Sequence, residues 1–290
     1  MGGACEKKDA KPPDNGAVTA LDSAGSSSGS AAAGPVDTTP LAGIDLALEG
    51  DKKQLFYKLI GSLQSPCGKA HSLRTSFTTD KSCKRAPFAV RYVMALISDE
   101  ANENDARTEY QKKYERTATP AKFDVSKAPS EGKVDAPVKI VEFFDYECPH
   151  CKVFSPKLEE LVKERAGQVS VTFLMFPIES RHPGSRQAAQ AALAANMQGK
   201  FGDVHGKLFD APQHTRDSVF ALAREAGLDM AKFDKDFAAA DAQVTSDAKQ
   251  GEDAGVDSTP TLFINNLKYE GPVHPKYIGM WLDEEAAVNR

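Results

Sequence analysis

The sequence lacks several features that would assign the chain to a particular class of protein. Its 290 residues contain no uninterrupted apolar run near the roughly 18 residues of a membrane-spanning helix. No Lys/Arg cluster stands out and the net charge is −5, so nothing predicts binding to nucleic acid. Met1 is followed directly by GGAC, without the apolar core of a secretory signal. With 41% hydrophobic and 27% charged residues, the chain is expected to be a soluble globular protein of one large or two modest domains.

Cysteine is scarce, with five residues in three groups: Cys5 alone, Cys67 with Cys83, and Cys148 with Cys151. An odd count leaves one thiol without an intrachain partner, and Cys5 is the obvious candidate. The small residues before Cys5 resemble the end of a bacterial lipoprotein cleavage site, although the apolar region that should precede them is absent. We therefore expect a lipid anchor at Cys5 on a sequence whose start is truncated or misassigned. The alternative is a thiol with no role.

Residues 1–43 contain little that a fold can bury. They include KPPDNG and SAGSSSGSAAAGPVDTTP, in which ordering the backbone would cost entropy without a gain from packing. We predict a disordered, flexible tether, which suits a lipid anchor better than it suits a free N-terminus. An untethered disordered tail is the alternative.

The pattern becomes helical over residues 44–119. Leucines repeat at four-residue spacing from Leu55 to Leu63, which places them on one face of a helix. A second apolar stripe covers 90–97, and a charged third segment covers 105–114. We predict a small all-α domain.

Residues 120–290 are predicted to form an α/β domain. Two runs rich in β-branched and aromatic residues, VKIVEFF (138–144) and VSVTFLMF (169–176), suit buried strands. A helical pattern lies between them, so the three form a βαβ unit with a parallel pair of strands. Further along we expect Ala-rich helices over 184–256, strands at 260–266 and 268–270, and a closing helix over 276–287. This order is that of a thioredoxin-like fold with a helical insertion, here preceded by the all-α domain.

The motif CPHC stands where the first strand meets the following helix. Pro149 suits the first helical position, because its missing N–H would have no partner there. Cys148 then lies at the helix N-terminus, where unpaired N–H groups and the helix dipole stabilise a thiolate. His150 adds to this effect if it is protonated or donates a hydrogen bond. Cys151 lies one turn further and should be buried, able to attack a mixed disulfide on Cys148.

Two other interpretations of this cysteine pair are weaker. A structural zinc site needs a second pair of ligands, and none lies nearby at a similar spacing. An inert buried pair would be an odd coincidence at a Pro-initiated helix that follows an apolar strand. We expect neither a metal nor a cofactor, because the chemistry lies entirely in sulfur.

Two further features favour redox chemistry. Thr259 and Pro260 lead directly into a strand, and a proline there is often cis in this architecture. The preceding residue then offers backbone groups to an extended substrate. Glu142 is a lone carboxylate in an apolar strand, six residues before Cys148. It either points out of the sheet or is buried with a raised pKa, placed to take the proton of Cys151, and we favour the second interpretation.

Three stretches resemble the DsbA family of bacterial thiol:disulfide oxidoreductases, in its shorter BdbD-like branch. They are VEFFDYECPHCKVFSPKL, HPGSRQAAQAALAANMQGKFGDVHGKLF and GVDSTPTLFINN, within residues 123–290. The resemblance implies that Cys148 is the nucleophile, Cys151 the resolving thiol, Pro260 a cis-proline and Glu142 a buried acid.

This sequence departs from the family by placing Asp145 and Glu147 close to the cysteines. A thiolate pKa near 3.5 rather than near 7 stabilises the reduced form by roughly 4 kcal/mol at pH 7, on the order of 100 mV for two electrons. Acidic neighbours raise the pKa of a thiol, so we expect an oxidising strength below that of the family's prototype.

The helical segment is faintly similar to the small CcmH-type module of cytochrome c maturation, through SPCGKAHSL, RYVMALISDE and DARTEYQKKY. That module carries C-x-x-C where this chain has only Cys67. We expect Cys67 and Cys83 to form a structural disulfide, worth roughly 3 kcal/mol for a loop of about 17 residues. The alternatives are a second redox pair that relays electrons to Cys148, and metal binding by Cys67 with His71 on one helix face.

Together these patterns predict an enzyme that oxidises dithiols of substrate proteins at Cys148 and Cys151, in the periplasm or another extracytoplasmic compartment. We expect a membrane redox partner that reoxidises the site, and membrane contact only through an anchor at Cys5. One alternative is a reductase or isomerase that acts with a cytochrome c maturation-type partner. The other is a non-catalytic protein that binds its clients through the same fold.

Overall fold

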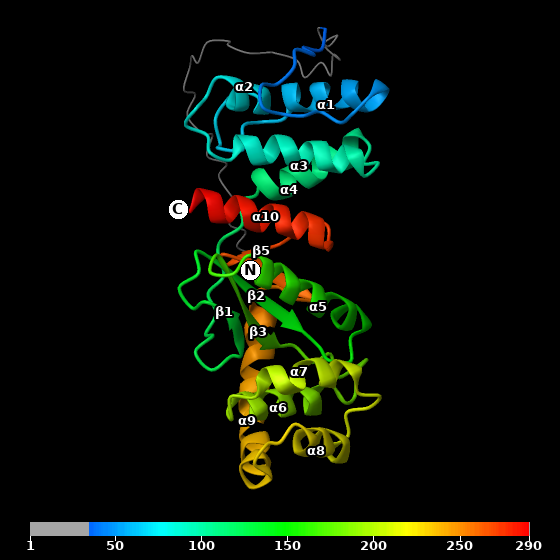
Figure 1. Ribbon diagram of the computed structural model, residues 1–290, viewed down its shortest axis with the longest axis vertical. Helices are drawn as coiled ribbons and strands as arrows, with labels where there is room; N and C mark the ends of the chain where they lie inside the picture. The colour runs from blue at the N-terminus through cyan, green and yellow to red at the C-terminus, as the bar shows by residue number, and fades with distance from the viewer. Residues whose placement is uncertain (1–34, 290) are drawn as a thin grey trace, which may run out of the picture. The chain divides into compact units, whose positions relative to one another are not determined.

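The structure, a computed structural model, describes residues 35–289 (Figure 1). The anchor predicted at Cys5 and most of the tether predicted over 1–43 lie outside the described residues. Residues 35–40 are exposed and without regular structure, whereas Leu41 packs in the core. From Val36 onward the chain forms one compact unit. The predicted domain division at 119/120 stays a prediction.

The N-terminal segment contains the helices α1 (Gly50–Ser62), α2 (Leu73–Thr78), α3 (Ala86–Ser98) and α4 (Glu103–Tyr114). The predicted leucine stripe forms the buried face of α1, where Leu59 and Ile60 are inaccessible to solvent. Helix α4 begins at a cap in which the Asn102 side chain accepts a hydrogen bond from the Asp105 N–H. Helix α2 was not predicted, because its six residues are too few to show a periodic pattern.

A disulfide joins Cys67 to Cys83 across a Cα–Cα distance of 5.8 Å. It connects the turn before α2 to the turn before α3. Cys67 and His71 lie in turns rather than on a helix, and the Cys67 sulfur is used in the disulfide. The metal-binding alternative for this pair was therefore wrong, since the shared helix face on which it depended does not form.

A five-stranded mixed sheet in the order β1-β3-β2-β4-β5 carries the candidate site (Figure 1). Its strands are β1 (Ser130–Gly132), β2 (Val138–Phe144), β3 (Val169–Met175), β4 (Thr261–Ile264) and β5 (Leu267–Lys268). Strands β2 and β3 are parallel and joined by α5 (Pro149–Glu164), which confirms the βαβ unit, and β4 runs antiparallel to β2. Strand β1 was not predicted, because its three residues SEG include no β-branched or aromatic side chain.

Side chains of β2 alternate between the two faces of the sheet. Ile140 and Phe144 belong to the large core that includes residues of α5 and of α10 (Pro275–Val288), whereas Phe143 and Phe263 belong to a smaller cluster on the opposite face. Glu142 stands between Ile140 and Phe144 in register, so the alternation places it on the α5 side. An acidic side chain is thereby held inside the core next to the start of α5.

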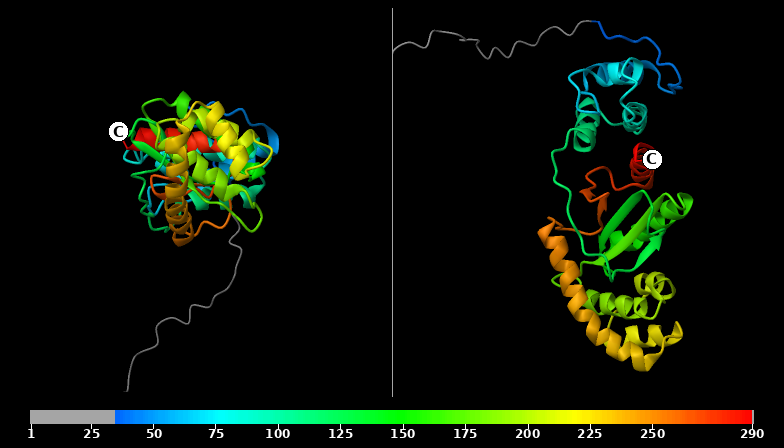
Figure 2. Two further views of the ribbon diagram at one scale, coloured as in Figure 1. Left: turned by 90° about the horizontal axis from the view of Figure 1, so that it is seen from below. Right: turned by 90° about the vertical axis from the view of Figure 1, so that its left-hand side faces the viewer.

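The predicted helical insertion is confirmed between β3 and β4. It consists of α6 (Ser185–Asn196), α7 (Phe201–Asp210), α8 (Arg216–Glu225) and α9 (Met230–Asp253). Helix α9 packs on both α6 and β3 (Figures 1 and 2). A Cβ atom at Gly251 of α9 would lie 2.6 Å from the Phe176 ring, so only glycine allows this close approach to the sheet.

Helix α10 contacts α3 on one side and β2 on the other. Its Glu284 is fully buried, and accepts hydrogen bonds from Arg85 at 2.8 Å and from the Tyr114 hydroxyl at 2.8 Å. The Lys113 ammonium lies 3.0 Å from the same carboxylate and 4.0 Å from the centre of the Trp281 ring. Trp281 is 1% exposed and packs in the core. Buried charges therefore join the N-terminal helices to the last helix of the α/β part.

Candidate active site

Cys148 is the N-cap residue of α5, and Cys151 lies in its first turn. The Cys148 backbone is extended (φ −73°, ψ 118°), and Pro149 occupies the start of the helix as the sequence predicts. Cys148 is 5% exposed and Cys151 is fully buried, and neither is in a disulfide. The structure therefore shows a reduced pair in which Cys148 is the more accessible thiol.

The surroundings of Cys148 favour its thiolate. A hydrogen bond from the Cys151 thiol is the largest factor that lowers the pKa of Cys148, from 9.0 to about 5. Burial opposes this effect, while the Thr259 side chain and the backbone N–H groups of Cys151 and His150 support it. His150 thus acts through its backbone N–H at the helix N-terminus, and its side chain is exposed.

Cys151 and Glu142 are both held in their protonated forms. Burial raises the pKa of Cys151 well above its ordinary value, and the neighbouring Cys148 and Glu142 add to this. Burial also raises the pKa of Glu142 from 4.5 to about 8, helped by the negative charge of Glu159. Neither carboxyl oxygen of Glu142 has a hydrogen-bond partner among the residues that the structure describes. Of the two orientations considered for Glu142, the buried one is present.

Two histidines near or within the insertion engage the acidic residues beside the cysteines. Asp145 Oδ2 lies 2.8 Å from Nδ1 of His182, and Glu147 Oε1 lies 3.0 Å from Nδ1 of His214. Neither acid is among the main groups that set the pKa of Cys148, and the expected lower oxidising strength stays a prediction. Their carboxylates hold the loop before Cys148 in place.

A buried histidine that the sequence did not single out also supports this loop. His205 of α7 is 2% exposed, with Nδ1 2.8 Å from the Tyr146 hydroxyl and Nε2 3.0 Å from Ser155 Oγ. Burial lowers the pKa of His205 to about 3, so the imidazole is neutral. It ties the residue two positions before Cys148 to α5. No sequence signal marks this role, because a histidine in a helical stretch is as often on the surface.

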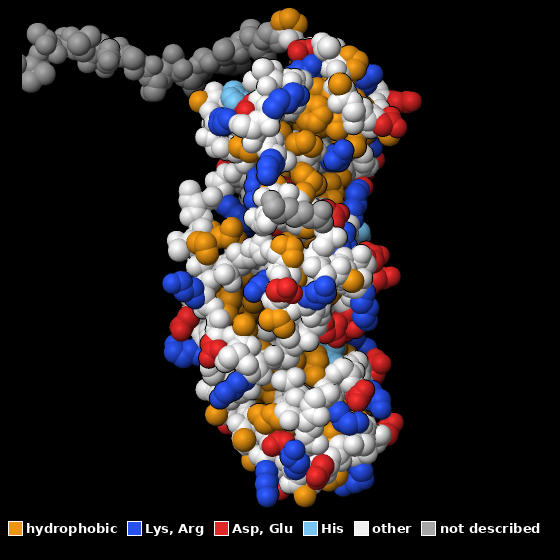
Figure 3. Space-filling model, turned by 60° about the vertical axis from the view of Figure 1, so that its left-hand side comes forward, with side chains coloured by type: hydrophobic (Ala, Val, Ile, Leu, Met, Phe, Trp, Pro, Cys, Tyr) orange, Lys and Arg blue, Asp and Glu red, His pale blue; other side chains and the backbone are white. Residues whose placement is uncertain are grey.

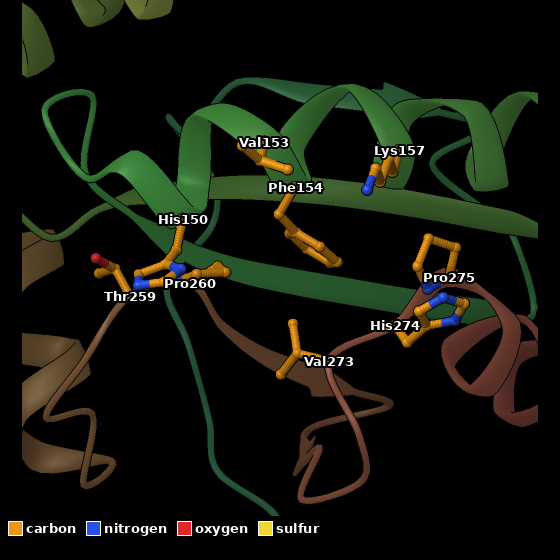
Figure 4. A pocket seen from close by; sticks show the side chains of 9 residues that line it. All are labelled: His150, Val153, Phe154, Lys157, Thr259, Pro260, Val273, His274 and Pro275. Carbon is orange, nitrogen blue, oxygen red and sulfur yellow. The ribbon is translucent and has the colours of Figure 1, made fainter. Parts of the chain in front are cut away.

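The loop before β4 faces the cysteines. The Thr259–Pro260 peptide bond is cis, and the Thr259 carbonyl oxygen lies 3.4 Å from the Cys148 sulfur. A cavity of about 480 Å³ opens beside them, and we call it the lateral groove (Figure 4). It is lined by His150, Val153, Phe154, Lys157, Thr259, Pro260, Val273, His274 and Pro275.

Other kinds of site were sought in the part of the chain that the structure describes. No group of three or more His, Cys, Asp or Glu side chains within residues 35–289 is arranged to hold a metal ion. No helix in the same residues is long and apolar enough to cross a membrane. Lys, Arg, Asp and Glu side chains are intermixed on the face shown in Figure 3.

Comparison with known proteins bears mainly on the α/β part of the chain. The thioredoxin family model matches residues 124–284. The protein named Na(+)/H(+) antiporter NhaA 1 of Mycolicibacterium vanbaalenii is 34% identical over 146 residues, which are 49% of this chain and 24% of the antiporter. The chain therefore spans about a quarter of the length of this relative.

A protein named for disulfide bond formation and a solved structure are also similar. A probable disulfide bond formation protein D of Bacillus cereus is 27% identical over 157 residues, covering 49% of this chain and 72% of that protein. The crystal structure of oxidised BdbD from Bacillus subtilis is 25% identical, with a TM-score of 0.52, and the match covers 59% of this chain and 99% of BdbD. These findings confirm the predicted fold class and the resemblance to the BdbD-like branch. The matched family residues begin at 124, so the similarity of the N-terminal helices to a CcmH-type module stays a prediction.

Proposed function

Because the chain belongs to the thioredoxin family, we propose that it is a thiol:disulfide oxidoreductase that oxidises dithiols of substrate proteins at Cys148 and Cys151. The asymmetry of the two thiols carries this proposal. The pKa of Cys148 is lowered to about 5, whereas burial raises the pKa of Cys151. A good leaving thiolate beside a protected second thiol is the arrangement that disulfide exchange requires.

The proposed reaction starts from the oxidised pair. A substrate thiolate attacks the Cys148 sulfur, the Cys148–Cys151 bond breaks, and its electron pair stays on Cys151, which takes up a proton. Glu142 is the proposed source of that proton, because a carboxyl with a pKa of about 8 is protonated at neutral pH. The Thr259 carbonyl, which faces the Cys148 sulfur, is placed to align the substrate backbone.

The second step releases the product. The other substrate thiolate attacks the substrate sulfur of the mixed disulfide, the substrate disulfide forms, and Cys148 leaves as a thiolate. The low pKa of Cys148 favours this departure. Two electrons have then passed to the cysteine pair, so a further protein must accept them before the next cycle. We propose a membrane redox partner for that step.

Extracytoplasmic localisation is part of the proposal. The disulfide between Cys67 and Cys83 supports it, because such bonds persist mainly in oxidising compartments. The lipid anchor at Cys5 lies outside the described residues and is proposed from the sequence alone. Cell fractionation of the wild type and Cys5→Ala tests both: an anchored protein leaves the membrane fraction when Cys5 is replaced.

Exchange is tested with oxidised full-length protein and a dithiol peptide. The wild type should oxidise one peptide per protein molecule, Cys148→Ala should oxidise none, and Cys151→Ala should accumulate mixed disulfides with substrate proteins in cells. A Cys148→Ala protein that still supports the cellular function would indicate client binding without catalysis. Failure of Cys151→Ala to trap any protein would remove the claim of protein substrates.

A further inference from the structure

The lateral groove has one wall on α5 and the other on the segment that leads into α10. His150, Val153, Phe154 and Lys157 follow one another at helical positions i, i+3, i+4 and i+7, so they share one face of α5. Residues 273–275 lie opposite, and the cis-proline loop closes the end nearest the cysteines (Figure 4). An extended segment that reacts at Cys148 therefore has a defined path along α5.

The middle of the groove is apolar and open to solvent. Val153 and Val273 are each 61% exposed, and the Phe154 ring projects into the space between the two walls (Figure 4). Large exposed apolar side chains that gather beside a reactive group indicate a contact surface for a partner. Covering them with an apolar client side chain removes that area from water, which favours binding.

The far end of the groove carries one positive charge, from Lys157, and one hydrogen-bond donor, from His274. Lys157 and His274 lie there (Figure 4), and no acidic side chain lines the groove. Lys157 has no hydrogen bond or ion pair among the described residues, whereas Lys152 and Lys163 of the same helix pair with acidic side chains. His274 Nδ1 accepts a hydrogen bond from the Lys276 N–H, so its Nε2 carries a proton and is a donor. This end of the groove is complementary to a carboxylate.

The spacing fixes where that carboxylate lies in the client. Lys157 follows Cys148 by nine residues, a rise of about 13 Å along the helix. An extended strand covers this distance in about four residues, and its residues two and four positions from the cysteine point to the same side. We propose that the lateral groove selects client segments with an apolar residue about two positions, and an acidic residue about four positions, from the cysteine that reacts with Cys148.

This inference rests on the proposed function, and the test separates the two. The probes are peptides with one cysteine activated as a 2-pyridyl disulfide, with Leu two positions away and Glu, Gln or Lys four positions away, on either side of the cysteine. The Cys148 thiolate of reduced full-length protein attacks the peptide sulfur and forms a mixed disulfide with it. The bond between the peptide sulfur and the pyridyl sulfur breaks, and pyridine-2-thione leaves and is followed by absorbance.

On one side of the cysteine, the Glu peptide should react about fivefold faster than the Lys peptide, as expected for a partly exposed ion pair. Lys157→Glu should invert this preference. Lys152→Glu is the matched control: it makes the same charge change on α5, nearer to Cys148, but Lys152 pairs with Asp210 outside the groove. The control should keep the preference, and high salt should weaken it.

Equal rates for the Glu and Lys peptides on both sides would overturn the inference and leave the proposed function standing. An equal loss of preference in Lys152→Glu and Lys157→Glu would also overturn it, since the effect would then be general electrostatics near the thiolate. A rate that falls as protein concentration rises would mean that a second copy of this chain occupies the groove. If no peptide reacts faster with Cys148 than with a simple thiol in solution, the proposed function itself fails.

Discussion

Replacing Cys151 by alanine should make the Cys148 thiol a weaker acid. The Cys151 thiol is the largest factor that lowers the pKa of Cys148 from 9.0 to about 5. A hydrogen bond to a charged group contributes about 1.5–3 kcal/mol, and each 1.36 kcal/mol corresponds to about one pKa unit. The pKa of Cys148 in Cys151→Ala should therefore rise by about 1 to 2. Cys151→Ser keeps a hydrogen-bond donor at the same position and should retain most of the effect.

The assay is the rate of alkylation by iodoacetamide as a function of pH, read for the peptide that contains Cys148 by mass spectrometry. Reading a single peptide is necessary because Cys5 adds a further thiol in any protein molecule that carries no lipid there. The pH at half-maximal rate gives the pKa of Cys148 in each variant. An unchanged midpoint in Cys151→Ala would refute the reasoning, and would assign the low pKa to the N–H groups at the start of α5. Equal shifts of the Cys148 pKa in Cys151→Ala and Cys151→Ser would refute the role of the Cys151 thiol as a hydrogen-bond donor.

Further substitutions test the energetics of the fold. Glu142→Gln should raise the free energy of unfolding by up to about 3 kcal/mol at pH 7. A carboxyl with a pKa of about 8 in the folded protein must take up a proton on folding at this pH, and glutamine removes that cost. The gain should vanish near pH 4, where the unfolded chain also binds the proton. Urea denaturation at both pH values measures this, and a gain independent of pH would contradict it. Glu284→Gln should lower the stability by about 3–5 kcal/mol by leaving the buried Lys113 ammonium without its carboxylate. Lys276→Ala, in an exposed pair, should change it by less than about 1 kcal/mol. Similar losses in both variants would argue against the buried cluster. Replacing Cys67 and Cys83 together by serine should cost roughly 3 kcal/mol and leave peptide oxidation intact. Lost exchange in that folded variant would instead favour a redox role for the pair.

The central features of the site were predictable because they are local. A strand pattern, a Pro-initiated helix and two cysteines one turn apart determine the position of Cys148 with little help from the rest of the fold. The buried state of Glu142 also follows from alternation along an apolar strand. The cis-proline loop was also recognisable from a local pattern, because Thr259 and Pro260 lead directly into β4.

The remaining features depend on distant parts of the chain. His182 and His214, which engage Asp145 and Glu147, follow them by 37 and 67 residues, so these pairs could not be predicted from the sequence around the cysteines. The Arg85 side chain reaches Glu284 across 199 residues. No local pattern reveals such pairs, because their formation requires the packing of helices that are remote in sequence.

The reduction potential of the Cys148–Cys151 pair tests the central claim most directly. Relative to thioredoxin, with a pKa near 7 and a potential of about −270 mV, a pKa of about 5 stabilises the reduced form at pH 7 by about 2.3 kcal/mol, or about 50 mV. Equilibration in glutathione buffers, with alkylation read peptide by peptide, should therefore give a potential near −220 mV, able to oxidise dithiols whose structural disulfides have potentials below about −300 mV. A value at or below about −270 mV would contradict the assignment as a disulfide donor and favour a reductase.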